Sequence, residues 1–207
     1  MSISDYGVCN LIESGSARYL VISKGVVKVT QPLSTLIGLT HDHKDQLETF
    51  LAEFDHNPNE LHGYFCARDS SIEQVVYLLD AWSRGEALND GWVPCSTWFW
   101  SDGNALQGVI NVRHRLTPAL ETSGGHIGYC VAPSHRRKGV ATAMLKAVLP
   151  HCRDVGIQRA LLTCDRDNWG SARTIEANGG VLGREAWSPS DQRVTRWYHI
   201  ELAMRDT

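Results

Sequence analysis

The segment HIGYCVAPSHRRKGVATAMLKAVL, residues 126–149, constrains the fold of this chain more than any other part. It begins as a short strand that ends at Pro133, passes through a basic turn, and continues after Gly139 as a helix with one apolar side. A buried strand is expected next, at Ala160–Cys164. Strands connected through a helix in this way run parallel, so the chain must contain an α/β unit.

Helices are predicted before this unit, and further strands on both sides of it. One helix is expected after Thr40, and a Ser70-x-x-Glu73 capping box opens a second. Thr117–Gly125 is predicted to be a loop. The remaining segments have strand or helix patterns: strands Thr97–Ser101, Leu106–Arg113, Val181–Trp187 and Val194–Met204, and a helix Ser171–Asn178. Together they predict a mixed α/β sheet.

Composition narrows the class of protein. The 207 residues carry a formal net charge of -3, and this lack of a basic excess disfavours nucleic acid as a partner. No apolar run approaches the roughly 20 residues that span a bilayer, and the N-terminus does not have the pattern of a signal peptide. The six cysteines form no Cys-x-x-Cys pair, so reduced thiols in a cytoplasm are the simplest interpretation.

Residues 1–35 differ from the rest. Two β-branched runs, Arg18–Ser23 and Val26–Thr30, flank Lys24-Gly25 and predict a hairpin. We expect an N-terminal extension over residues 1–35 and a globular domain over residues 36–207. The extension is a candidate for contacts in a homodimer.

The basic turn is the strongest candidate for a binding site. Arg136, Arg137 and Lys138 precede Gly139, where the helix begins. Unpaired N–H groups of a first helical turn and the helix dipole attract anions, and glycine lets a phosphate approach the backbone. A solvated basic face is the alternative. Neither a P-loop nor a Gly-x-Gly-x-x-Gly fingerprint is present, so nucleotide binding without coenzyme A is disfavoured.

The segment Arg136–Ala141 resembles the Arg/Gln-x-x-Gly-x-Gly/Ala motif of GNAT N-acetyltransferases. His126–Pro133 is similar to the central strand of that family. Asn168, Ser171 and Gly179-Gly180 resemble its Asn-x-x-Ser/Ala helix and the glycine that follows. The resemblance implies a mostly antiparallel central sheet with a splayed parallel pair, flanking helices, and transfer of acetyl groups from acetyl-CoA.

The resemblance also implies a set of cofactor-binding residues. Backbone groups of Cys130 and Val131 are expected to pair with the pantetheine arm. Asn168 and Ser171 are expected on the other side of the cofactor. The pyrophosphate is assigned to the turn and the helix start, which comprise Arg136, Arg137, Lys138, Gly139, Val140, Ala141 and Thr142.

The expected reaction is direct attack of an amine on the thioester carbonyl. His126 stands where many relatives carry a glutamate, so it is the candidate base, and a satisfied strand histidine is the alternative. The family's frequent tyrosine acid is replaced by Ile175. Tyr129, Cys164, Ser171 or a water are candidate substitutes, or the thiolate leaves unaided, and a packing role on its strand is the alternative for Tyr129. Cysteines are expected to be core residues rather than nucleophiles.

The expected acceptor is a small-molecule or peptide amine. No metal is expected, because the spacing of His41, His43, His56 and His62 fits no zinc signature. The alternative function is a non-catalytic sensor that binds acyl-CoA, which the missing tyrosine would permit.

Overall fold

The structure is a computed structural model that describes residues 10–14, 17–22, 25–29, 34–61 and 70–202. The chain divides into two compact units, residues 1–34 and 35–207. The first unit contains an antiparallel sheet of β1 (Asn10–Ser14), β2 (Ala17–Ile22) and β3 (Gly25–Val29), in that order. The predicted hairpin corresponds to β2 and β3. The residues at its turn, and the predicted end at Thr30, lie outside the described residues.

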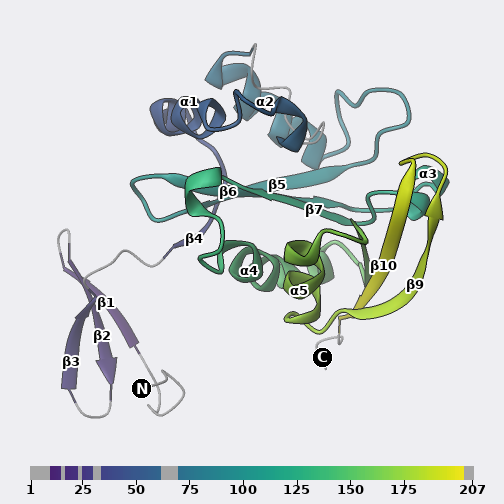
Figure 1. The fold of residues 1–207 in the computed structure, drawn as a ribbon. Helices are drawn as coiled ribbons and strands as arrows, with labels where there is room; N and C mark the ends of the chain where they lie inside the picture. The colour runs from purple at the N-terminus through teal and green to yellow at the C-terminus, as the bar shows by residue number, and fades with distance from the viewer. Residues whose placement is uncertain (1–9, 15–16, 23–24, 30–33, 62–69, 203–207) are drawn as a thin grey trace. The chain divides into compact units, whose positions relative to one another are not determined.

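The second unit contains a layer of antiparallel strands between helices. Figure 1 shows α1 and α2 on one side of this sheet and α4 and α5 on the other. The strand order is β4-β5-β6-β7, formed by β4 (Thr35–Ile37), β5 (Cys95–Ser101), β6 (Leu106–Arg113) and β7 (Ile127–Val131). The helices are α1 (Lys44–Ala52), α2 (Ile72–Ser83), α3 (Pro118–Thr122), α4 (Val140–Asp154) and α5 (Trp169–Glu176). Short 3₁₀ turns occupy His41–His43, Pro58–Leu61 and Pro133–His135.

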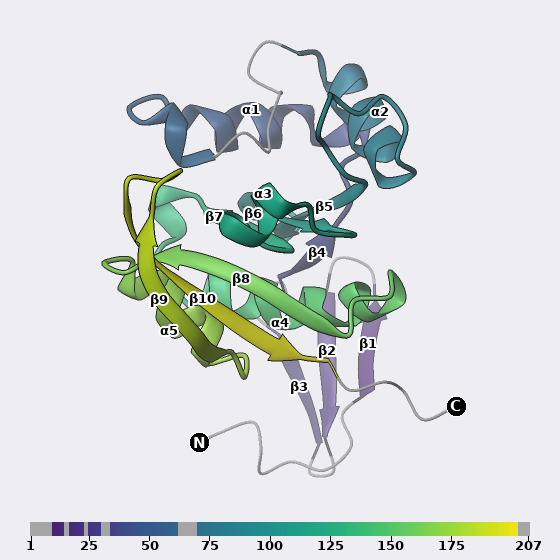
Figure 2. The same ribbon diagram turned by 90° about the vertical axis from the view of Figure 1, so that its right-hand side faces the viewer.

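A second antiparallel sheet follows α4. Its order is β8-β10-β9, formed by β8 (Arg159–Asp165), β9 (Val181–Ser188) and β10 (Arg193–Glu201), as Figure 2 shows. Among the described residues no ladder joins β7 to β8. An isolated antiparallel bridge pairs Gly125, which precedes β7, with Leu162 of β8. A Cβ at Gly125 would lie 2.3 Å from the Leu161 carbonyl oxygen, so glycine permits this close approach before the strands separate.

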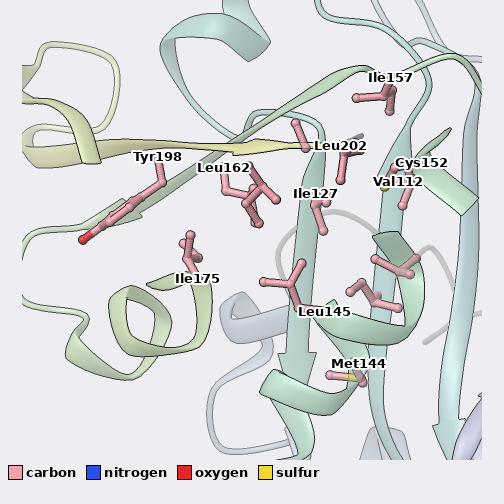
Figure 3. Close-up of a cluster of buried hydrophobic side chains, with 14 of the residues drawn as sticks. Val112, Ile127, Met144, Leu145, Cys152, Ile157, Leu162, Ile175, Tyr198 and Leu202 are labelled. Atoms are coloured by element: carbon pink, nitrogen blue, oxygen red, sulfur yellow. The ribbon is translucent and has the colours of Figure 1, made fainter. Parts of the chain in front are cut away.

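Burial on both faces of β6 explains the layered core. Ile110 and Val112 face α4, whereas Val109 belongs to the cluster under α1 and α2. Figure 3 shows Met144 and Leu145 of α4 within the first of these clusters. Each fully buried side chain of this size contributes about 1.5–3 kcal/mol through removal of apolar surface from water.

The predicted α/β class with a mostly antiparallel sheet is confirmed. Two local predictions were wrong. The capping box begins at Ser71, whose Oγ accepts from the Gln74 N–H, rather than at Ser70. The predicted loop at 117–125 contains α3, which Thr117 caps and Pro118 begins. A threonine followed by proline is a helix start, so the signal was present in the sequence.

Candidate functional site

The ladder between β6 and β7 decides which backbone groups face the gap beside β8. The Arg113 N–H donates to the His126 carbonyl at 2.8 Å, and the Ala132 N–H donates to the Gln107 carbonyl at 3.0 Å. In an antiparallel ladder, directly opposed pairs alternate between hydrogen-bonded and non-hydrogen-bonded. The backbone N–H and C=O groups of residues 127, 129 and 131 therefore point away from β6.

Tyr129 and Val131 belong to the set that points into the gap. The Val131 carbonyl confirms this orientation, since it accepts a 3.1 Å hydrogen bond from Arg136 Nε instead of from β6. The backbone of Cys130 faces Val109 across the ladder. Of the two residues predicted to pair with pantetheine, Val131 presents its backbone to the gap and Cys130 does not.

The start of α4 presents backbone N–H groups to the same gap. Gly139 is the N-cap residue, with φ of 79°, and Arg137 also has a positive φ of 63°. No side chain in the described chain caps this helix. A Cβ at Gly139 would meet nothing within 4 Å, so the space before the first turn is open. An anion can therefore approach the first-turn N–H groups.

The start of α5 faces β7 across the gap. Asn168 Oδ1 accepts a 3.0 Å hydrogen bond from the Ser171 N–H and caps the helix. The Ser171 hydroxyl lies 2.8 Å from the hydroxyl oxygen of Tyr129. The predicted Asn-x-x-Ser motif thus performs a structural task, because it fixes the hydroxyl that meets Tyr129.

These three segments line one cleft of about 570 Å³. The predicted site residues in its lining are Tyr129, Cys130, Val131, Arg136, Arg137, Gly139, Val140, Ala141, Thr142, Asn168 and Ser171. Lys138 and His126, also predicted, are not part of the lining that the structure describes. The lining contains five residues that the sequence analysis did not name: Glu60, His135, Gly170, Arg173 and Thr174.

The charged side chains that line the cleft carry a net positive charge. Three arginines, Arg136, Arg137 and Arg173, line it against the carboxylate of Glu60. Arg136 forms an ion pair with Glu60 in addition to its bond to Val131. The Glu60–Arg136 contact spans 76 positions of the chain, so no local sequence signal could have revealed it. This positive charge and the helix start suit a polyanion.

Tyr129 and Ser171 form a hydroxyl pair where two cavities adjoin. A second pocket, of about 200 Å³, shares Tyr129, Asn168 and Ser171 with the cleft. Burial raises the pKa of Tyr129 well above its usual value, whereas the Ser171 hydrogen bond acts against this rise. The phenol therefore stays protonated and can donate a hydrogen bond throughout the physiological pH range.

His126, the predicted general base, is held by hydrogen bonds to β8. Its Nδ1 accepts a 2.9 Å hydrogen bond from the Leu161 N–H, and the backbone N–H of His126 donates to the Leu161 carbonyl at 2.7 Å. Partial burial, with further contributions from Arg113 and His199, lowers the pKa of His126 from 6.5 to about 4. The His126 side chain joins the residue before β7 to Leu161 of β8.

The thiols next to the site are poor nucleophiles. Burial raises the pKa of Cys130 and that of Cys164 to about 11. At neutral pH both thiols stay protonated, so the site does not favour transfer through a cysteine.

Metal ligands and membrane segments were also sought. The described His, Cys, Asp and Glu side chains form no group of three that could hold a metal ion, and His62 lies outside the residues searched. No helix in the described ranges is long and apolar enough to cross a membrane.

A family model described as "Acetyltransferase (GNAT) domain" matches residues 35–181, which is more than half of the chain. The chain belongs to the GNAT acetyltransferases. The match includes the β7 edge, the start of α4 and the start of α5. A comparison with curated proteins finds no match.

Solved structures with the same fold include several acetyltransferases. The Microcin C7 self-immunity acetyltransferase MccE, solved with acetyl-CoA and AMP, is 16% identical with a TM-score of 0.58, covering 81% of this chain and 92% of its own. The Salmonella typhimurium acetyltransferase that modifies the N-terminal serine of ribosomal protein L7/L12 is 18% identical and has a TM-score of 0.59. The match covers 84% of this chain and 96% of that acetyltransferase. The ribosomal L7/L12 alpha-N-protein acetyltransferase RimL, solved with coenzyme A, is 16% identical and has a TM-score of 0.56. The match covers 93% of this chain and 98% of RimL. At these identities the likeness establishes the GNAT fold alone.

Within this GNAT domain, Ile175 is completely buried in the core between α5 and the β8-β10-β9 sheet. The position that the resemblance assigned to a tyrosine acid is therefore a packing position here. The Tyr129 hydroxyl reaches α5 from the opposite strand and meets the Ser171 hydroxyl there.

Proposed function

We propose that this GNAT domain transfers an acetyl group from acetyl-CoA to a primary amine of a small molecule or peptide by direct attack. The observation that supports this most is the cleft in which the β7 edge, the uncapped start of α4 and the Tyr129–Ser171 pair lie together. We also propose that residues 36–207 are the N-acetyltransferase domain and that residues 1–35 are an N-terminal extension.

The residues of the cleft fit acetyl-CoA, which supplies an activated thioester when bound. The N–H groups from Arg137 to Thr142 and the guanidinium groups suit its pyrophosphate, because a Cβ-free, uncapped helix start is open to anions. The backbone of Val131 suits the amides of a pantetheine arm. Asn168 and Ser171 bound the same space from α5.

In the reaction, the neutral amine nitrogen forms a bond to the acetyl carbon while the carbon–sulfur bond breaks. The amine gives up a proton, and the sulfur gains one. The Val131 N–H, which points into the gap, is placed to stabilise negative charge on the carbonyl oxygen. The Tyr129 hydroxyl is placed to donate a hydrogen bond to the departing sulfur, and Ser171 holds that hydroxyl in position.

Two measurements test this proposal. Calorimetry with acetyl-CoA should give a binding isotherm, and a thiol-release assay over amines, amino acids and short peptides should give turnover with at least one acceptor. No heat with acetyl-CoA would contradict the proposal. Tight binding without turnover over the whole panel would instead identify a sensor that binds acyl-CoA.

A further inference from the structure

The second pocket lies beside the cofactor cleft and has a different chemical character. It lies between the loop after α3, β7, β8 and the β9–β10 turn. It adjoins the cleft at the Tyr129–Ser171 hydroxyl pair, because both cavities include these residues and Asn168 in their linings. A molecule in this pocket would therefore reach the proposed reaction centre from a cavity next to that of the cofactor.

The charged side chains of this pocket leave a net negative charge. Asp165, Asp191 and Arg193 line it. Arg193 Nη1 pairs with Asp165 Oδ2 at 2.7 Å, so these two charges compensate each other. The carboxylate of Asp191 is held by hydroxyl groups alone among the contacts described: Oδ1 accepts from Ser123 and Oδ2 from Ser188, each at 2.9 Å. These hydrogen bonds fix the carboxylate without neutralising it.

The buried hydroxyl of Thr195 is independent evidence for a polar ligand in this pocket. Thr195 lines the pocket and is only 2% exposed, and within the described chain its Oγ1 has no hydrogen-bond partner. A buried hydroxyl without a partner is unfavourable, and native proteins satisfy nearly all such groups. Its neighbour across the strands is Asp165, which places the hydroxyl on the same face of the sheet as that carboxylate. A polar group bound in the pocket would satisfy it.

We infer that this pocket takes the acceptor, and that the acceptor is a small amine with a second positive charge, such as an aliphatic diamine. This inference rests on the proposed function. The distal ammonium group binds Asp191, and the reacting amine lies towards the Tyr129–Ser171 pair. The pocket volume of about 200 Å³ is below the roughly 300–1,000 Å³ of sites for drug-sized ligands, which favours a small acceptor. An amino acid is disfavoured, because Asp165 already neutralises Arg193.

Three acceptors of nearly equal length test the charge preference. With saturating acetyl-CoA, thiol release is measured for 1,4-diaminobutane, 1-aminobutane and 4-aminobutanoate, which differ at the distal end. The kcat/KM for the diamine should exceed that for the monoamine by about tenfold or more, the ratio expected of one charge-assisted hydrogen bond. The carboxylate acceptor should be the poorest. Equal values for the diamine and monoamine, or preference for 4-aminobutanoate, would overturn the inference.

Variants locate the preference in the pocket. Asp191→Asn keeps the size of the side chain and should raise KM for the diamine about tenfold, with KM for 1-aminobutane and the Kd of acetyl-CoA changed less than about twofold. Thr195→Val should also raise KM for the diamine, without loss of thermal stability. Asp90→Asn, on an exposed loop outside both cavities, is the matched control. An unchanged KM in Asp191→Asn would overturn the assignment.

Calorimetry with acetyl-CoA separates failure of the inference from failure of the proposed function. No binding of acetyl-CoA overturns both. Binding without turnover of any of the three amines, or turnover without preference for the diamine, overturns the acceptor assignment alone.

Discussion

The Tyr129 hydroxyl reaches from β7 to the first turn of α5, where it meets Ser171 at 2.8 Å. Tyr129→Phe removes the hydroxyl and leaves the ring in place, so we expect kcat to fall about 10- to 100-fold with the Kd of acetyl-CoA almost unchanged. Thiol release at saturating substrates measures the first quantity and calorimetry the second. Tyr77→Phe, on an exposed part of α2, is the control. Full activity in Tyr129→Phe would exclude the hydroxyl from the reaction.

His126 should govern stability in acid rather than turnover. Its folded-state pKa of about 4 lies below the ordinary 6.5, so below pH 6.5 the unfolded chain binds a proton that the folded chain excludes. The contribution of His126 to stability is therefore complete above pH 6.5 and is lost progressively as the pH falls to about 4. His126→Asn keeps a hydrogen-bond acceptor but does not titrate. Its melting temperature should fall less between pH 7 and pH 4.5 than that of the wild type.

The exposed His56 provides the control, since His56→Asn should leave the wild-type pH dependence of melting intact. Parallel melting curves for His126→Asn and the wild type would contradict the stability argument. The pH dependence of kcat tests the role of His126 as the general base. If His126→Asn abolishes a limb of the pH–rate profile near neutral pH, His126 is the base.

At the scale of elements, the start of α4 is the proposed binding site for the pyrophosphate. Gly139→Glu and Gly139→Gln impose the same strain at φ of 79° and add similar bulk, but only glutamate adds negative charge. Both should weaken acetyl-CoA binding, and Glu should weaken it at least about tenfold more than Gln, because it repels the pyrophosphate. Calorimetry at low ionic strength measures the difference. Equal affinities in the two variants would place the pyrophosphate elsewhere.

The Pro58–Leu61 turn meets the cleft through the ion pair of Glu60 with Arg136. Glu60→Gln removes the carboxylate from a cleft that should hold a polyanion, and it removes the ion pair with Arg136. We expect acetyl-CoA to bind about two- to fivefold more tightly, with the gain shrinking as added salt screens both charges. Arg136→Gln should weaken binding. Weaker binding in Glu60→Gln would mean that the carboxylate positions Arg136 for the cofactor.

At the scale of the whole molecule, the sequence was sufficient to predict features whose signals lie close together in the chain, such as helix starts. Gly139 marks a helix start, and Asn168 with Ser171 marks another, because each signal lies within one turn of the helix it begins. Contacts between distant segments left no such signal. Glu60 reaches the cleft from the turn after α1, and Thr195 reaches the second pocket from β10.

The ladder on β7 shows the same limit at the level of a single residue. The sequence could assign the strand but not which of its backbone groups faces β6, since that depends on the register with Gly108 and Val109. Cys130 and Val131 were both predicted to pair with pantetheine through their backbones. The backbone of Val131 faces the gap, whereas that of Cys130 faces β6. Likewise, only tertiary structure could show that the carboxylate of Asp191 meets the hydroxyl of Ser123.

The division of the chain leads to a last prediction. The strands β1–β3 pair with one another in the described residues, and the described residues that line the cleft fall between Glu60 and Thr174. A chain that begins at Ser34 should therefore bind acetyl-CoA with a Kd within about twofold of the full chain. A chain that begins at Gly38 is the matched comparison, because it also lacks β4, which pairs with β5. It should melt at a lower temperature, since it loses ladder hydrogen bonds and the packing of Leu36 against the core. Calorimetry and thermal melting measure both effects. Loss of binding in the chain that begins at Ser34 would show that residues 1–33 contribute to the acetyltransferase domain.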